Sequence, residues 1–182
     1  MLDVKLPFIL FLIVFAIFFI KNLKRNTLMK NFVNLTFAIY VASVIAITIF
    51  PIPFDKTTIY YASQSSYLHN NMIPFNFLSD FSAYQTFGNF LLLLPLGVYV
   101  PLLSEKMKSI KKILVVGVLS SLGIELTQLV ISMIAGYTYR QADIDDLILN
   151  TLGTVVGYVA FKFLFNLCKR QFDLEIFSLL KK

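Results

Sequence analysis

Charged residues are scarce in this chain: they make up 14% of its 182 residues, whereas hydrophobic residues make up 58%. Typical soluble domains contain about 25% charged residues. A water-soluble domain of this size could not bury so much apolar surface, so the soluble classes are excluded and an integral membrane protein remains. The chain also lacks internal repeats, low-complexity tracts and a glycine-rich phosphate-binding loop.

Cysteine and histidine each occur once. The single cysteine, Cys168, excludes an internal disulfide and a thiolate metal cluster. His69 lies between two apolar stretches, and we expect no metal-binding or catalytic role for it. No nucleophile with an adjacent base is visible, so the sequence gives no signal for nucleophilic catalysis.

Five apolar stretches dominate the chain. Their approximate bounds are 6–20, 32–52, 87–103, 113–135 and 147–165. A membrane-spanning helix needs about 20 apolar residues, so the first and third stretches must include flanking residues. The first lacks a small-residue cleavage site, and we expect a retained helix there rather than a signal peptide. We predict an all-α, polytopic transmembrane bundle of about five membrane-spanning helices, formed by a single domain over residues 1–182.

The distribution of cations predicts how these helices are oriented in the cell membrane. Cations gather in three segments on one side of a five-span bundle: Lys21, Lys24, Arg25 and Lys30; Lys106, Lys108, Lys111 and Lys112; and Lys169, Arg170, Lys181 and Lys182. The positive-inside rule makes this side cytoplasmic. The amino terminus is then outside the cell and the carboxyl terminus is in the cytoplasm. The formal charge of +6 therefore reflects topology, and we expect no nucleic-acid partner.

Segment 53–86 becomes an external connection between the second and third spans, and we expect it to be partly ordered. It contains the amphipathic run Met72-Ile-Pro-Phe-Asn-Phe-Leu78. Such a run either lies in the interface of the outer leaflet or dips into the mouth of the bundle. The alternative is an ordinary ordered loop that packs on the helix ends.

A polar stripe marks the start of the fifth span. Asp143, Asp146, Asn150, Gly153 and Gly157 follow one another at steps of three, four, three and four, so they lie along one side of a helix. The carboxylates and the amide indicate a site at one mouth of the bundle. The two glycines indicate close approach by a neighbouring helix. Asp143 also fits the cap of this helix, with Asp146 in its first turn.

The fourth span contains an acid, Glu125, followed three residues later by Gln128. Glu125 lies ten residues before Ala135, which places it roughly 15 Å deep at a rise of about 1.5 Å per residue. A carboxylate at that depth costs about 2.5–3.5 kcal/mol, so it should face the bundle interior. Glu125 and Gln128 either hydrogen-bond neighbouring helices and fix their register, or line a polar pocket that opens to the outer face.

Further polar groups converge on the same end of the bundle, which favours the pocket. Asn89 enters the third span near its outer end, and Arg140 precedes the fifth span. Arg140 either pairs with Asp143 or Glu125, or offers a forked donor to a phosphate or carboxylate of a ligand. Pro95 should kink the third span and free a carbonyl that a neighbouring group must satisfy.

These positions define the candidate site. Glu125 is the candidate catalytic residue. The candidate ligand-binding residues are Asn89, Gln128, Arg140, Asp143, Asp146 and Asn150. A divalent cation such as magnesium or calcium fits the oxygen-rich cluster of Asp143, Asp145 and Asp146, and we predict no other metal site.

Four motifs follow one another over about residues 70–160. They are Met72-Ile-Pro74-Phe75; Gly88-Asn89-Phe90-Leu-Leu-Leu-Leu-Pro95-Leu-Gly97; Glu125-Leu-Thr-Gln128; and Arg140-x-x-Asp143-x-Asp145-Asp146-Leu-Ile-Leu-Asn150-Thr-Leu-Gly153-x-x-x-Gly157. In this order they resemble the VanZ-like family, small multi-span membrane proteins of bacteria, apart from Ala142, where a bulky residue is usual. The family's namesake is associated with resistance to teicoplanin-type glycopeptides. The resemblance therefore implies an envelope role linked to glycopeptide or lipoglycopeptide protection.

We therefore expect a polar pocket, open to the outer face, that engages an envelope lipid or a lipid-linked cell-wall precursor and contributes to glycopeptide resistance. Two alternatives stay open. In the first, the protein is an intramembrane enzyme in which Glu125 acts as acid or base on a phosphate-bearing envelope lipid. In the second, it is a non-catalytic membrane scaffold for other envelope proteins. A homo-oligomer is compatible with each of these functions.

Overall fold

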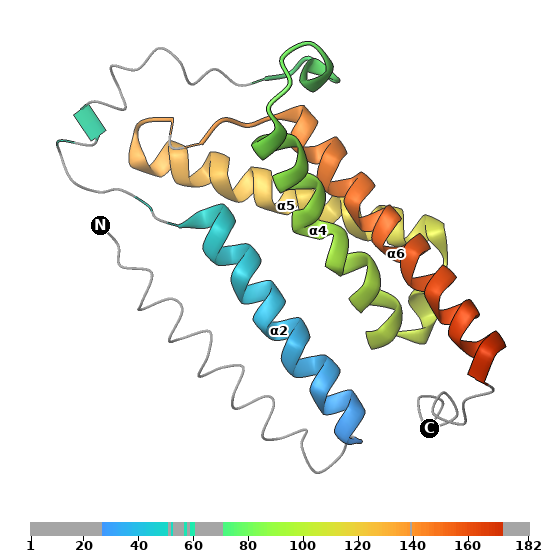
Figure 1. Ribbon diagram of the computed structural model, residues 1–182. Coiled ribbons are helices and arrows are strands. Elements are labelled where there is room, and N and C mark those ends of the chain that lie inside the picture. The colour runs from blue at the N-terminus through green and yellow to red at the C-terminus, as the bar shows by residue number, and fades with distance from the viewer. Residues whose placement is uncertain are drawn as a thin grey trace.

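The structure is a computed structural model that describes residues 27–50, 52, 57, 59–60, 71–138 and 140–172. Its long helices are α2 (Leu28–Ile49), α4 (Ala83–Leu103), α5 (Ile110–Ala135) and α6 (Ile144–Phe172) (Figure 1). Two short 3-10 helices, η1 (Asn76–Leu78) and η2 (Glu105–Met107), lie in the connections before and after α4.

Each of the four long helices is long and apolar enough to cross a membrane. The chain is therefore a multi-pass membrane protein, and the predicted all-α transmembrane class is confirmed. The last four predicted spans correspond to α2, α4, α5 and α6. The first predicted span, at 6–20, lies outside the described residues, so the described part of the chain has four spans where about five were expected for the whole.

Polar residues cap the starts of α2 and α4. α2 and α4 each begin four residues before the predicted stretch. The Thr27 side chain accepts a hydrogen bond from the backbone N–H of Lys30 at 3.4 Å, and Ser82 accepts one from Gln85 at the same distance. These are N-cap contacts, which satisfy helix donors that have no partner inside the helix. α5 ends where Gly136 takes a left-handed conformation, with φ of 75°.

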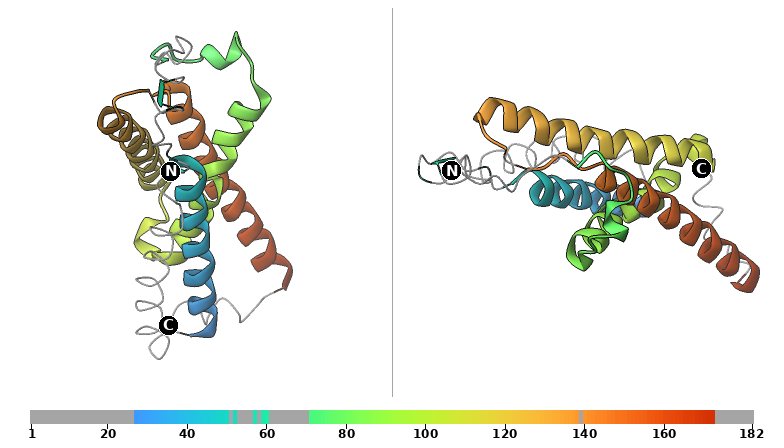
Figure 2. Two further views of the ribbon diagram at one scale, coloured as in Figure 1. Left: turned by 90° about the vertical axis from the view of Figure 1, so that its left-hand side faces the viewer. Right: turned by 90° about the horizontal axis from the view of Figure 1, so that it is seen from above.

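The four helices pack unequally. α6 packs chiefly against α4 and then against α5, whereas α2 contacts α4 and α5. In Figure 1, α5 crosses behind the α4–α6 pair. The two further views in Figure 2 show that α5 and α6 run at an angle to each other rather than side by side along their whole length. The first residues of α4 and α6 and the last residues of α2 and α5 lie at the same end of the bundle. We call it the pocket end, after the pocket described below.

Glycines bring α4 and α6 into backbone contact. A methyl group added at Gly153 would fall on the carbonyl oxygen of Phe90, and one added at Gly157 would fall on that of Leu94. Gly97 of α4 meets the backbone of α6 in the same way. Small residues at such positions let membrane helices approach closely. The predicted role of Gly153 and Gly157 in close helix approach is confirmed.

α4 continues through Pro95, and groups from neighbouring helices bind the carbonyls of that region. The Tyr40 hydroxyl of α2 donates to the carbonyl oxygen of Leu92 at 2.9 Å. The Thr154 hydroxyl of α6 donates to the carbonyl oxygen of Leu93 at 3.2 Å. Pro95 has no backbone N–H and leaves the carbonyl of Leu91 without its helical donor, and these two side chains bind the next two carbonyls along α4.

The buried centre of the bundle includes polar side chains. Ser121 of α5 and Asn150 and Thr154 of α6 are 0%, 1% and 0% exposed. Many large apolar side chains instead point outward from the helices. Outward apolar groups and inward polar groups are the arrangement expected for a bundle surrounded by lipid.

The loop of residues 71–82 folds over the start of α6. Asn71 forms an isolated parallel bridge with Asp143. The backbone N–H of Asn71 donates to the carbonyl of Ala142, and the N–H of Ile144 donates to the carbonyl of Asn71, both at 3.0 Å. This part of the predicted external segment is therefore joined to the fifth predicted span.

Candidate functional site

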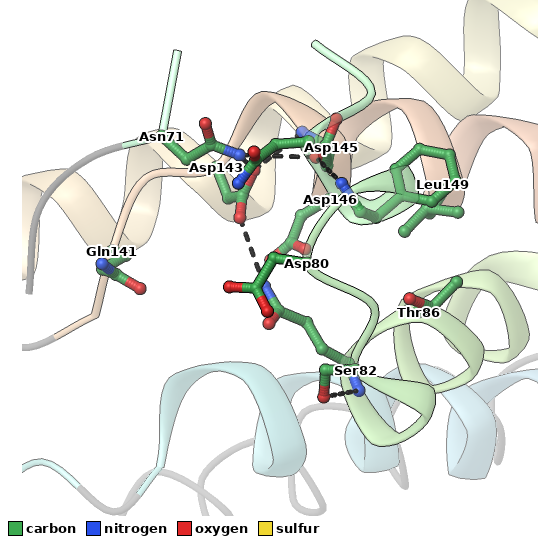
Figure 3. Close-up of a pocket in the computed structure, with 12 residues that line it drawn as sticks. Asn71, Asp80, Ser82, Thr86, Gln141, Asp143, Asp145, Asp146 and Leu149 are labelled. Atoms are coloured by element: carbon green, nitrogen blue, oxygen red, sulfur yellow. Dashed lines mark hydrogen bonds between the residues drawn. The ribbon is translucent and has the colours of Figure 1, made fainter. Parts of the chain in front are cut away.

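A pocket of about 320 Å³ lies at the pocket end, between the 71–82 loop and the first turns of α4 and α6. Its lining is mainly polar and includes four aspartates, Asp80, Asp143, Asp145 and Asp146. The other lining residues are Asn71, Asn76, Phe77, Ser82, Gln85, Thr86, Gln141 and Leu149. Figure 3 shows that these side chains come from segments far apart in the chain. None of the described residues that line the pocket is a lysine or an arginine.

Asp145 holds the loop on α6. Its carboxylate accepts hydrogen bonds from the backbone N–H of Phe75 at 2.6 Å and of Phe77 at 2.9 Å. The Asn71 amide donates a third, longer bond at 3.4 Å. Because the side chain is only 3% exposed, these donors replace the water that a carboxylate would otherwise bind. Asp145 therefore fixes the shape of one wall of the pocket.

Asp143 caps α6 and reaches two other segments. One carboxylate oxygen accepts the backbone N–H of Asp145 at 2.8 Å, as an N-cap residue does. The same oxygen accepts the Asn71 amide at 2.8 Å, and the second oxygen accepts the Gln85 amide at 3.2 Å. The predicted capping role of Asp143 is confirmed, and the same residue joins the loop and α4 to the start of α6.

Asp146 and Asn89 connect the first turn of α6 with α4. The Asn89 side-chain amide donates to the carboxylate of Asp146. Asp146 lines the pocket, whereas Asn89 belongs to α4 and is not one of the lining residues. This bond fixes the Asp146 carboxylate to α4 at the edge of the pocket.

Glu125 lies beside the start of α6. Its carboxylate accepts the backbone N–H of Asp143 at 3.3 Å. The sequence placed Glu125 near the middle of its helix and about halfway through the membrane. The structure brings it to the first turn of α6, because α5 and α6 run at an angle and α5 continues past this contact. Glu125 is half-buried and does not line the pocket.

Gln128 and Arg140 bind the end of α2. The Gln128 amide donates to the carbonyl oxygen of Thr48 at 2.9 Å, and the Arg140 guanidinium donates to that of Ile47 at 3.0 Å. The last carbonyls of a helix have no partner inside the helix, so these side chains satisfy them. Both residues therefore connect α2 with the segments around the site and lie outside the pocket lining.

Asn150 lies deeper, between α5 and α6. Its amide nitrogen donates to the Ser121 hydroxyl at 3.0 Å, and its backbone carbonyl accepts the Thr154 hydroxyl at 3.0 Å. Its side-chain oxygen is buried and makes no hydrogen bond with a described residue. Asn150 therefore belongs to the polar centre of the bundle beneath the pocket.

The seven predicted site residues thus form a pocket part and a supporting part. Asp143 and Asp146 line the pocket, and Asn89 and Glu125 hydrogen-bond to them. The other three residues form the supporting part. Gln128 and Arg140 hydrogen-bond to α2, and Asn150 hydrogen-bonds to α5.

Sequence reasoning missed several pocket residues, among them Asn71, Asp80 and Gln85. One signal was available for Gln85: it precedes Asn89 by four residues, which places both side chains on one side of α4. Asn71 and Asp80 lie in a segment without helical periodicity, so the sequence carried no comparable signal for them.

The aspartates do not gather as ligands around one point. Within the described ranges, no group of three His, Cys, Asp or Glu side chains is placed to hold a metal ion. The oxygens of Asp145 are bound by backbone amides of the loop, and the Asn71 amide donates to both Asp143 and Asp145. His69 lies outside the described residues.

Comparisons with known proteins give one positive result. No curated protein and no solved structure matches the chain. The family model described as VanZ/LLP1 matches residues 37–166, a range that contains α4, α5, most of α6 and the whole pocket lining. The match covers more than half of the 182 residues, and the chain belongs to the VanZ/LLP1 family.

Proposed function

We propose that the pocket receives the polar headgroup of an envelope lipid or of a lipid-linked cell-wall precursor. Through this binding, the protein contributes to resistance against teicoplanin-type glycopeptides and lipoglycopeptides. The observation that carries the proposal is a polar pocket of about 320 Å³ at the end of a bundle whose outer surface is apolar. Concave sites with a few convergent polar groups are the usual binding sites of small ligands.

The charge distribution supports an outward-facing pocket in the cell membrane. At the end opposite the pocket, Lys106 and Lys108 lie in or beside η2, and Lys111 and Lys112 lie in the first turn of α5. The pocket end carries a group of aspartates instead. Under the positive-inside rule, the lysine-rich end is cytoplasmic and the pocket faces the outside.

The chemistry of the lining favours ligands that donate hydrogen bonds. Its aspartates accept hydrogen bonds when ionised, and its amides and hydroxyls can both donate and accept. A headgroup with hydroxyl or ammonium donors fits these acceptors. A bare phosphate would face like charges, without a lysine or arginine among the described lining residues. Glu125, the candidate acid or base, does not line the pocket, so the proposed function is binding of a ligand rather than catalysis.

Asp80 offers a clean test of the pocket. Its side chain is exposed at the pocket and makes no hydrogen bond or ion pair with a described residue, so its removal should leave the fold intact. Glu105 is a matched control, because it is an exposed acid at the opposite end, 3.5 Å from Lys108. The two alanine variants are expressed in a glycopeptide-susceptible bacterium, and susceptibility to teicoplanin and vancomycin is measured.

We expect the unchanged chain to raise the inhibitory concentration of teicoplanin and the Asp80→Ala variant to lose several-fold of that protection. Glu105→Ala should protect as the unchanged chain does. Asp146→Asn, which keeps the shape of the side chain, should lower protection as well. Full protection by both pocket variants, at equal amounts of folded protein in detergent extracts, would rule out the pocket as the cause. Equal losses in all three variants would favour a scaffold function.

A further inference from the structure

The loop over the pocket has two different sides. Asn71, Asn76 and Asp80 contribute to the pocket lining. Six large apolar or aromatic side chains of the same region are exposed instead, and we call them the lip: Met72, Ile73, Phe75, Leu78, Phe81 and Tyr84. Leu78 is 73% exposed and Tyr84 is 91% exposed. Exposed apolar patches of this kind mark surfaces that another apolar phase covers.

Hydrogen bonds to α6 fix the position of the loop that carries the lip. Asp145 accepts the backbone N–H groups of Phe75 and Phe77, and the Asn71 bridge joins the loop to the start of α6. Phe75 adopts φ of 66°, a left-handed conformation that is uncommon for a bulky residue. The six lip side chains therefore stay on the outer side of the loop, although the backbone conformation at Phe75 is strained. Strain of this kind persists only where surrounding contacts enforce it.

The lip continues into the lipid-facing surface of α4. Phe81 contacts Phe87 edge to face, with ring centroids 6.4 Å apart. Phe87 and Leu91 are exposed on the first turns of α4, a helix that is itself apolar enough to span a membrane. The 21 residues of α4 extend roughly 31 Å, about the thickness of the hydrocarbon layer. The start of α4, where the lip lies, would then be at the level of the membrane interface.

We propose that the lip inserts into the interface of the lipid bilayer and that the occupant of this apolar surface is lipid. Three observations favour lipid over a protein partner or a second copy. The lip is continuous with a membrane-spanning surface, it includes an exposed tyrosine of the type that anchors proteins at the interface, and Asp80 is the one charged residue in 72–84. The pocket beneath the lip then opens at headgroup depth, so its ligand enters sideways from the membrane.

Insertion of the lip goes beyond the proposed function, because it would hold whether or not a headgroup occupies the pocket. Insertion of the lip also implies that the ligand reaches the pocket from the bilayer. A ligand reaching the pocket from the bilayer keeps its acyl chains beside α4 while its headgroup enters the polar lining.

The absence of tryptophan in this chain makes a direct test possible. Leu78→Trp and Tyr84→Trp each give a single fluorophore on the lip. The full chain is reconstituted in phosphatidylcholine vesicles that carry bromine either near the headgroup end or deep in the acyl chains. Leu119→Trp, on the exposed side of α5 near its centre, serves as the lipid control, and Lys106→Trp at the opposite end serves as the aqueous control.

We expect the lip tryptophans to emit at shorter wavelengths than Lys106→Trp. Bromine near the headgroups should quench the lip tryptophans several-fold more than it quenches Lys106→Trp. Bromine deep in the acyl chains should quench the lip tryptophans less than bromine near the headgroups does. Leu119→Trp should show the opposite depth preference. Acrylamide in the water should quench the lip variants only weakly.

Two results would overturn lip insertion. Strong quenching of both lip variants by acrylamide, without quenching by bromine, would place the lip in water. Protection from both quenchers would show that protein covers the lip. Either result would leave the resistance measurement with Asp80→Ala unaffected, so failure of the lip and failure of the pocket are distinguishable.

Discussion

The carboxylate of Asp145 accepts hydrogen bonds from two backbone amides of the loop over the pocket, those of Phe75 and Phe77. The left-handed conformation of Phe75 costs on the order of 1–3 kcal/mol, so the loop keeps this shape only while its amides are bound. Together with the Asn71 bridge, this buried side chain thus holds the wall of the pocket and the backbone of Phe75 in the lip.

Replacement of Asp145 by alanine should release the loop locally. Each lost hydrogen bond to a charged acceptor is worth about 1.5–3 kcal/mol, and two backbone donors would lose their partner. We expect backbone amide exchange to accelerate at residues 75–77 by at least an order of magnitude, while exchange within α4 changes little. Hydrogen–deuterium exchange of the detergent-solubilised protein measures this effect. Asp80→Ala is the control, and equal exchange in both variants would contradict the role given to Asp145.

The sequence predicted some site residues and not others, for identifiable reasons. Helical spacing was sufficient for Asp143 and Asp146, because Asp143 caps α6 and Asp146 lies in its first turn. Asp145 was grouped with its neighbours as a cation ligand, whereas its partners lie about 70 residues earlier, in a loop without periodicity. Gln128 and Arg140 bind backbone carbonyls of α2, and no side-chain pattern encodes such partners.

At the scale of elements, α4 and α6 form the central contact on which the site is built. Their glycines place backbone against backbone, and the pocket lies where the two helices begin. The apolar stretches and the spacing of Gly153 and Gly157 predicted the spans and their close approach. The angle between α5 and α6 was not predictable, because it depends on which side chains interlock across the interface. For that reason the sequence did not predict that Glu125 lies beside the start of α6.

A series of glycine-to-alanine changes tests the central contact. At Gly153 the added methyl group would fall on the carbonyl oxygen of Phe90, so the helices must separate and stability should fall by about 1–3 kcal/mol or more. At Gly123 nothing lies within 4 Å, so Gly123→Ala should be neutral or stabilising by up to about 1 kcal/mol, because alanine favours helices. At Gly117 the nearest atom is the Thr154 Cβ at 3.1 Å, and we expect an intermediate loss.

Thermal unfolding of the purified variants in one detergent measures this series. The melting temperature should follow the order Gly123→Ala, Gly117→Ala, Gly153→Ala, from highest to lowest. A Gly153→Ala protein as stable as Gly123→Ala would show that α4 and α6 do not meet at this glycine.

At the scale of the whole molecule, charge and polarity divide the bundle between its two ends. Lysines gather around η2 and the start of α5, and aspartates gather around the pocket. Glycopeptides act outside the cell. The proposed function therefore requires that the pocket faces outward. The orientation can be measured without reference to drug resistance.

Cysteine labelling tests the orientation directly, because Cys168 is the only native cysteine and can be replaced by serine. In that background, Asp80→Cys places a thiol at the pocket and Lys106→Cys places one at the opposite end. A membrane-impermeant maleimide should label Asp80→Cys in intact cells and Lys106→Cys only after permeabilisation, with equal labelling of both in detergent. The reverse pattern would put the pocket in the cytoplasm, where it could not meet an extracellular glycopeptide, and would overturn the resistance function while leaving the helix packing as described.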